Sequence, residues 1–144
     1  MTQTVEQALA AAVLFSDGEL YKIVHLPPNA ITAAAAVLAE IGEPFSALIV
    51  DKDEVTLVLT KGDLEDYARR LPGYSNSTDD YRLISFDVAL DPTLTGFMAR
   101  VSQALADAKV VIMPFAAFDR DHLLVPAGQF ERAMAALEKL RGTG

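Results

Sequence analysis

The same order of structural elements occurs twice along this 144-residue chain, and this internal repeat constrains the fold more than any other feature. In the first half, hydrophobic periodicity and turn residues predict strand, helix, strand, strand and helix over residues 21–26, 31–41, 45–50, 55–60 and 63–71. A shift of 66 residues aligns the hairpin and last helix of this half with the second half without a gap, which matches Gly62 to Gly128 and Glu65 to Glu131. Such elements are common enough to match by chance, but the unbroken register favours two diverged βαββα units.

The second half contains clear signals for each of its elements. Residues 81–90 alternate as a strand does, and its more apolar face consists of Arg82, Ile84, Phe86, Val88 and Leu90. Asp91-Pro92 joins a favoured N-cap to a favoured first helical residue, so it predicts that a helix starts there. Two apolar stripes have helical spacing, namely Leu94, Phe97, Met98, Val101 and Leu105, and Phe130, Ala133, Met134, Leu137 and Leu140. Between them, apolar runs at 110–118 and 122–125 predict a hairpin, in which Pro114 indicates an edge strand or a bulge.

Each predicted unit has three strands, one fewer than the four of a split β-α-β sandwich. We therefore expect an α+β fold of ferredoxin-like topology, with antiparallel sheets and helices on one face. The missing strand would come from the other half or from the N-terminal segment around Val13–Phe15. The predicted domains are an N-terminal unit at 1–72, which includes the N-terminal helix and strand, a polar linker at 73–80, and a C-terminal unit at 81–144.

Composition and motifs exclude several classes of function. Twenty acidic and 12 basic residues give a net charge of −8, which disfavours nucleic acid as a partner. The chain has no cysteine, and its two histidines have no metal-ligand spacing, so no metal site is predicted. There is no glycine-rich nucleotide loop and no nucleophile elbow, so we expect no cofactor and no catalytic residue. Apolar stretches are too short to span a membrane and the N-terminus lacks the basic region of a secretory signal, so a cytoplasmic protein without a membrane partner is expected.

The junction from Leu90 to Gly96 is where the sequence indicates binding. A helix that starts there directs free N–H groups outward, which suits a ligand carboxylate. Gly96 would allow a ligand to approach the backbone closely. On spacing alone, an alternative stays equally open: Asp91 only caps the helix and Gly96 only eases packing.

The stretch from Leu90 to Phe97, the amphipathic helix that ends at Lys109, and the segment Phe115-Ala-Ala-Phe-Asp-Arg-Asp-His-Leu-Leu-Val-Pro126 resemble the ACT domains of the CASTOR type and of related small bacterial ACT proteins. The resemblance covers about residues 12–140. Its most specific part is the hairpin, which is similar to the family's Ser-Thr-Phe-Asp-Thr-Asp-x-x-Leu-Val stretch, with Ala116-Ala117 where Ser-Thr is common. The resemblance implies tandem ferredoxin-like units that bind an amino acid, arginine in the best-known sensors, at the interface between units.

By position, the resemblance implies that the ligand faces Asp121 of the hairpin and the loop residues Thr95 and Gly96. The complete set of expected ligand-binding residues is Asp91, Leu94, Thr95, Gly96, Ala117, Phe118, Asp119 and Asp121. An α-carboxylate would accept hydrogen bonds from N–H groups of the helix, and an α-ammonium would donate to Asp121. We therefore expect a non-catalytic regulatory or sensing module for a small amino-acid-like ligand, assembled as a homodimer.

Two alternatives stay open. Asp119 and Asp121 can be simple turn residues, and the chain would then be a ligand-free interaction module whose exposed edge strands join subunits. An enzyme on the same scaffold is the weakest alternative, because the sequence contains no acid–base pair beside a clear nucleophile.

Overall fold

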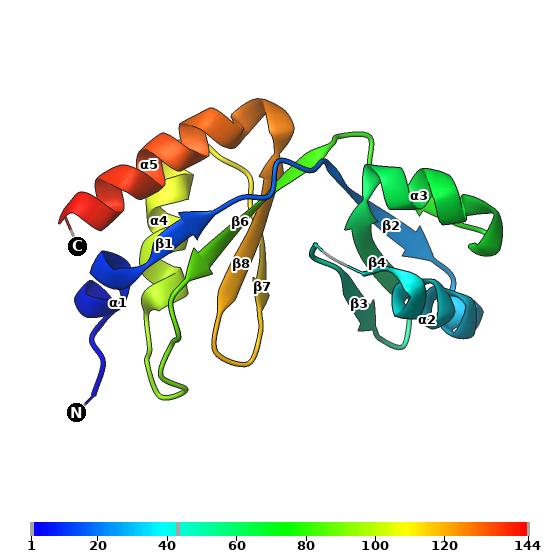
Figure 1. Ribbon diagram of the computed structural model, residues 1–144, viewed down its shortest axis with the longest axis horizontal. Coiled ribbons are helices and arrows are strands. Elements are labelled where there is room, and N and C mark those ends of the chain that lie inside the picture. Colours follow the sequence, from blue (N-terminus) through cyan, green and yellow to red (C-terminus); the bar gives the residue numbers. More distant parts are fainter. Residues whose placement is uncertain (1, 43, 144) are drawn as a thin grey trace. The chain divides into compact units, whose positions relative to one another are not determined.

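The computed structural model describes residues 2–42 and 44–143, and the chain divides into two compact units (Figure 1). The central unit is Asp17–Tyr81, whereas the terminal unit combines Met1–Ser16 with Arg82–Gly144. The central unit is therefore one uninterrupted segment, and the terminal unit is built from two segments that are distant in sequence.

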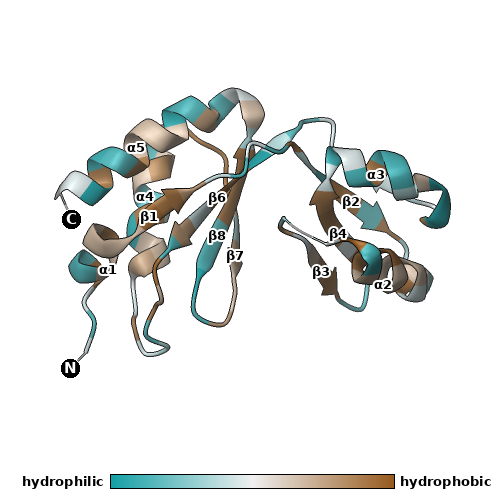
Figure 2. Cartoon of the chain, in the orientation of Figure 1, coloured by the Kyte–Doolittle hydropathy of each residue, from teal (hydrophilic) through white to brown (hydrophobic). Residues whose placement is uncertain are grey.

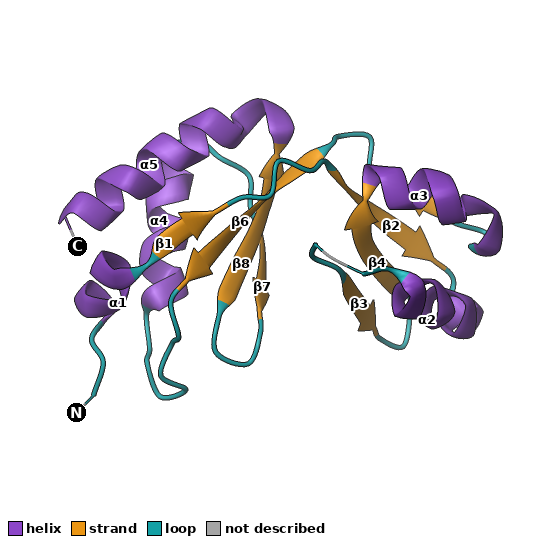
Figure 3. Cartoon of the chain, in the orientation of Figure 1, coloured by secondary structure: helices purple, strands orange, loops and turns teal. Residues whose placement is uncertain are grey.

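The central unit is an antiparallel sheet with the strand order β5-β2-β4-β3, covered by helices (Figure 3). Its elements are β2 (Tyr21–Leu26), α2 (Ile31–Glu40), β3 (Ala47–Val50), β4 (Val55–Thr60), α3 (Lys61–Tyr67) and β5 (Ser75–Asn76), with 3-10 helices at Pro28–Ala30 and Ala68–Arg70. The core of this unit consists of Val24, Leu26, Ala30, Ala34, Val37, Val55, Leu57, Leu59, Leu64 and Leu71. Because the core residues of β2 and β4 alternate along each strand, one face of the sheet carries the helices. Figure 2 shows the hydrophobic character of β3 and β4.

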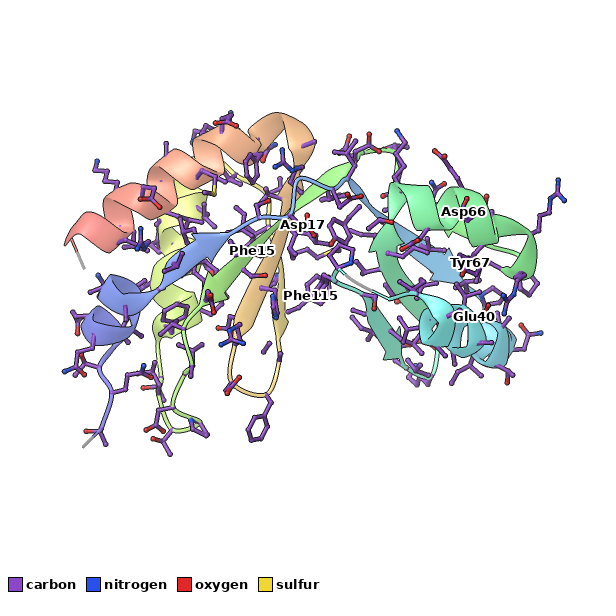
Figure 4. The ribbon with its side chains drawn as sticks, in the orientation of Figure 1. Phe15, Asp17, Glu40, Asp66, Tyr67 and Phe115 are labelled. Carbon is purple, nitrogen blue, oxygen red and sulfur yellow. The ribbon has the colours of Figure 1, made fainter. Side chains whose placement is uncertain are left out.

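A side-chain contact joins the two helical regions of the central unit. The guanidinium of Arg70 forms an ion pair with Glu40 at the end of α2 and lies 5.5 Å from the centre of the Tyr67 ring. Figure 4 labels Glu40 and Tyr67 on the neighbouring helices. At the other end of α3, the Thr60 hydroxyl caps the helix by accepting a hydrogen bond from the Asp63 N–H.

The terminal unit has the same architecture, with the strand order β1-β6-β8-β7. Its elements are α1 (Val5–Ala11), β1 (Val13–Phe15), β6 (Tyr81–Asp87), α4 (Phe97–Asp107), β7 (Met113–Ala116), β8 (Asp121–Pro126) and α5 (Phe130–Thr143), with a 3-10 helix at Ala127–Gln129. Its core consists of Ala8, Leu9, Ala12, Ile84, Phe86, Phe97, Val101, Leu105, Val110, Leu123, Val125, Phe130, Ala133 and Leu137. Three helices and one face of the sheet contribute to this core, so the helices again cover a single face.

The fold confirms the predicted α+β class and the two tandem βαββα units of ferredoxin-like topology. The predicted domain boundaries do not match the segments that supply the fourth strand of each unit. The central unit obtains its fourth strand, β5, from within the segment 73–80 that was predicted to be a linker, through pairing of Val24 with Asn76 and His25 with Ser75. The terminal unit obtains its fourth strand from β1, which pairs with β6. The N-terminal helix and strand therefore belong to the same unit as residues 82–144, not to the first repeat.

The start of α4 is a second correction. The helix begins at Phe97, five residues after Pro92, and β6 ends at Asp87 instead of Leu90. The reason is that Asp91 starts a turn: its carboxylate accepts a hydrogen bond from the Thr93 N–H at 2.9 Å, and its backbone oxygen accepts one from the Leu94 N–H at 2.9 Å. Gly96, with φ of +92°, then redirects the chain into the helix. The prediction that Asp91 caps α4 is therefore wrong.

The predicted hairpin is present as β7 and β8, joined by residues 117–120. The structure also fits the prediction for Pro114, because β7 lies at the end of the strand order. No helix within residues 2–42 and 44–143 is long and apolar enough to cross a membrane.

Candidate ligand-binding site

A pocket of about 350 Å³ lies within the terminal unit, where three segments meet. The segments are the loop after β6, the first turn of α4, and the turn between β7 and β8. The lining residues are Leu90, Asp91, Pro92, Leu94, Gly96, Phe97, Met98, Ala99, Ala116, Ala117, Phe118, Asp119, Arg120 and Asp121. Seven of the eight residues expected from the sequence are in this set, and the structure thus brings together two segments that the sequence only suggested were neighbours. The exception is Thr95, which is exposed and does not line the pocket.

The first turn of α4 gives the pocket an electropositive wall. Gly96 occupies the N-cap position and has no side chain with which to satisfy the first N–H groups of the helix. Phe97, Met98 and Ala99 occupy the following positions, and all three line the pocket. The first turn contains no acidic residue, so no side chain of the helix itself offsets the partial positive charge of this helix end. This arrangement suits an anionic group such as a carboxylate.

Asp91 has a structural role in the loop after β6. Its carboxylate accepts hydrogen bonds from both the backbone and the hydroxyl of Thr93, at 2.9 and 2.7 Å. The hydroxyl of Thr93 and, next, its N–H group lower the pKa of Asp91. The Asp91 N–H donates to the side chain of Gln3 at 2.8 Å. These bonds fix the loop, so Asp91 shapes the pocket wall.

The β7–β8 turn is held on both sides. The Ala117 N–H donates to the backbone oxygen of Arg120 at 2.9 Å, which closes the turn. The Leu90 N–H donates to the backbone oxygen of Asp119 at 2.7 Å, which ties the turn to the loop after β6. Phe118, at the tip, is 94% exposed. The backbone of the pocket is therefore fixed, whereas the Phe118 side chain projects into solvent.

Asp121 is a partly buried acid of the pocket at the start of β8. It lies on the same face of β8 as the core residues Leu123 and Val125, and is paired with Ala116 across the hairpin. Burial raises the pKa of Asp121, and the charge of His122 opposes this rise only in part. A carboxylate that has lost part of its hydration is stabilised by a cation, so Asp121 is suited to an ammonium group.

Sequence reasoning missed the contribution of Arg120, which lines the pocket and forms an ion pair with Asp87 at 3.4 Å. It also missed Met98 and Ala99, because the helix was expected to start earlier. The positive φ of Gly96 is the cause, and the glycine itself was the signal that could have indicated the later start.

A second, wider pocket of about 530 Å³ lies between α4 and α5. Its lining is Ala104, Asp107, Ala108, Arg132, Ala135, Ala136, Lys139 and Leu140. The guanidinium of Arg132 already donates to the backbone oxygens of Ala108 and Lys109, at 2.8 and 2.9 Å. Because the guanidinium of its arginine is already bonded to the backbone, we regard this pocket as the weaker candidate. In the described part of the chain, no cluster of three acidic or histidine side chains could hold a metal ion.

Comparison with known proteins identifies a domain within the chain. Residues 76–139 match the family model of the ACT domain. A search of curated protein sequences finds no match. Solved structures with a similar fold include a protein from Agobacterium tumefaciens, at 24% identity with coverage of 90% of this chain and 89% of that chain, and a TM-score of 0.68. A Vibrio cholerae protein of unknown function, described as a possible transport protein, has 19% identity, 95% coverage of both chains and a TM-score of 0.73.

A similar fold also occurs in a solved structure whose role is named. The regulatory subunit of aspartate kinase from Thermus thermophilus has 18% identity, with coverage of 89% of this chain and 97% of that chain, and a TM-score of 0.67. At identities below 25%, these likenesses show a common fold. The family match therefore identifies an ACT domain in residues 76–139, and the whole chain has the fold of these structures.

Proposed function

We propose that this protein is a non-catalytic regulatory module that binds a small amino acid in the pocket between the α4 N-terminus and the β7–β8 turn. The observation that carries the proposal is the pairing of an uncapped helix end with the partly buried Asp121 in one pocket. The two ends of an amino acid match these groups. The name of the Thermus thermophilus structure, a regulatory subunit, supports a regulatory role for the common fold.

In the proposed complex, the α-carboxylate accepts hydrogen bonds from N–H groups of Phe97, Met98 and Ala99. The α-ammonium donates to Asp121. The ligand side chain lies toward the apolar part of the lining, which includes Leu94 and Met98. The ligand gains from both ends only when it carries a carboxylate and an ammonium group together, which favours amino acids over simple acids or amines.

Among the described residues that line the pocket, the ionisable side chains are three aspartates and one arginine. The described residues that line the pocket include no serine, cysteine, lysine, histidine or tyrosine. The Ser85 hydroxyl lies 2.6 Å from Nδ1 of His122, but Ser85 is only 6% exposed and neither residue lines the pocket. Burial lowers the pKa of His122, so at neutral pH this pair is an uncharged hydrogen bond in the sheet.

Thermal unfolding in the presence of each common amino acid tests the proposal. A ligand at 100 times its Kd stabilises a protein by about 2.7 kcal/mol, so a ligand with a Kd of about 0.1 mM is readily detected at about 10 mM. We expect at least one amino acid to raise the Tm, and Asp121→Asn to abolish this rise. The matched control is Asp53→Asn, which makes the same change of charge in the hairpin turn of the central unit. If no amino acid raises the Tm, or if Asp121→Asn binds as well as the unmodified protein, the proposal fails.

Subunit association through an edge strand is a second candidate function. β3 lies at the end of the strand order in the central unit, and its Ile49 and Val50 are 47% and 49% exposed. Exposed apolar residues on an edge strand favour pairing with a second chain. The proposal predicts a homodimer whose mass, measured by light scattering over a range of concentrations, falls to that of a monomer in Ile49→Lys. An unchanged mass in this variant would exclude β3 as the contact.

A further inference from the structure

The ammonium group of Lys22 is enclosed by oxygen atoms from four consecutive residues. Its Nζ lies 3.2 Å from the backbone oxygen of Ser77, 3.5 Å from that of Thr78 and 3.4 Å from that of Asp79. It also lies 2.9 Å from Oδ1 of Asp80. Lys22 is only 9% exposed and is the second residue of β2. We call residues 77–80 the connector, because they lead from β5 into β6.

The connector has few other attachments. Its four side chains, Ser, Thr, Asp and Asp, are all polar, so no apolar anchor packs into the core. The strand before it, β5, has two residues, and both are exposed. Ser77 exchanges hydrogen bonds with the backbone of Ile23, at 2.9 Å through its N–H and 3.2 Å through its hydroxyl. Lys61 forms a second ion pair with Asp80 at 3.2 Å.

The geometry around Lys22 is that of a cation site. Carbonyl oxygens and a carboxylate converge on one positive centre, as they do around a bound metal ion. A buried ammonium is unfavourable unless such groups surround it, and the three carbonyl oxygens would repel one another without a cation between them. The positive charge and the bent course of the connector therefore depend on each other.

We propose that Lys22 is a tethered cation that holds the connector closed against the central unit, and that the connector opens locally when this charge is removed. This role is independent of the ligand pocket, because every group involved belongs to the central unit. It places a charge-dependent contact directly before β6, close to the start of the ACT match at residue 76. Lys22 is a positioning residue in this proposal.

Hydrogen exchange measured residue by residue tests the proposal. Lys22→Met keeps the apolar stem of the side chain, which is one atom shorter, and removes the charge. We expect the Ser77 amide, which donates to Ile23, to exchange about 10- to 100-fold faster, the range set by the loss of charge-assisted hydrogen bonds. Amides of β4 and α4 should exchange at unchanged rates. The matched control is Lys52→Met, because the Lys52 side chain is 88% exposed and forms an ion pair with the neighbouring Asp53.

Chemical rescue separates the role of charge from that of packing. In Lys22→Ala, added propylammonium should restore slow exchange at Ser77, whereas propanol, of similar shape but neutral, should not. Unchanged exchange in Lys22→Met, or equal rescue by propanol, would overturn the proposal. If either variant fails to fold, Asp80→Asn serves instead. It removes the negative charge of the carboxylate beside Lys22 and leaves Lys22 in place. Ser77 exchange must then rise in Asp80→Asn, and an unchanged rate would also overturn the proposal.

Discussion

Replacement of Gly96 by alanine should destabilise the terminal unit through backbone strain alone. Gly96 has φ of +92°, and an added Cβ would have Val5 Cγ2 as its nearest neighbour at 3.8 Å, an ordinary contact. A steric clash with neighbouring atoms therefore contributes little. An L-residue in this backbone region costs about 1–3 kcal/mol, so this is the expected loss of unfolding free energy.

Gly62 provides the matched control, because the same substitution should have the opposite sign there. Gly62 lies in α3, and a Cβ at this position would have no atom within 4 Å. Alanine in place of glycine in a helix stabilises by roughly 0.5–1 kcal/mol, and less near the helix start. The two variants differ from the parent by one added methyl group each, so their comparison isolates the backbone conformation.

Urea and thermal unfolding of the three proteins measure the effect. A change of 1 kcal/mol shifts the Tm by about 2–8 °C, depending on whether the two units unfold together. We expect the Tm to fall in Gly96→Ala and to rise slightly in Gly62→Ala. A Gly96→Ala variant as stable as the parent would refute the reasoning, because it would mean that the loop reaches α4 without a left-handed residue.

Three further predictions concern the core and two carboxylates. Leu105→Ala removes a fully buried side chain from the terminal core and should cost about 2–5 kcal/mol in denaturant unfolding; a loss below 1 kcal/mol would contradict the packing. Because the pKa of Asp121 is raised in the folded state, its stabilising contribution is present in acid and is lost as pH rises through that pKa. Asp121→Asn should therefore be more stable than the parent at neutral pH and equal to it in acid, and the reverse order would exclude burial as the cause. Lys22 and then Lys61 lower the pKa of Asp80. The contribution of Asp80 to stability is therefore present at neutral pH and is lost as pH falls through the lowered pKa. Asp80→Asn should lose this acid sensitivity, as a pH series of unfolding midpoints would show.

The repeat made most of the fold predictable, because alternating strands such as Val55–Thr60 and helical stripes such as Val101 and Leu105 carry their structure in local periodicity. The strand β5 was not predictable in this way. Ser75 and Asn76 are exposed and polar, and they form a strand only because β2 offers them backbone partners. Strand formation by such residues depends on tertiary pairing more than on propensity.

The candidate site was predictable where it depends on chain order and missed where it depends on backbone geometry. The Asp91-Pro92 pair fits a helix start and a turn equally well, and the hydrogen bonds with Thr93 decide for the turn. The position of Arg120 beside Asp87 depends on the pairing of β6 with β8, which sequence spacing does not specify.

The split of the terminal unit across the chain has a consequence for the order of folding. Val13 must pair with Asp87, and the whole central unit lies between them. Closing so long a loop carries an entropic cost before any contact forms, which slows folding. Once the central unit has folded, pairing of Tyr21 with Tyr81 holds the ends of this loop together. The effective length of the loop that must close is then much shorter. We therefore expect β1 to find its partner in β6 only after the central unit has formed.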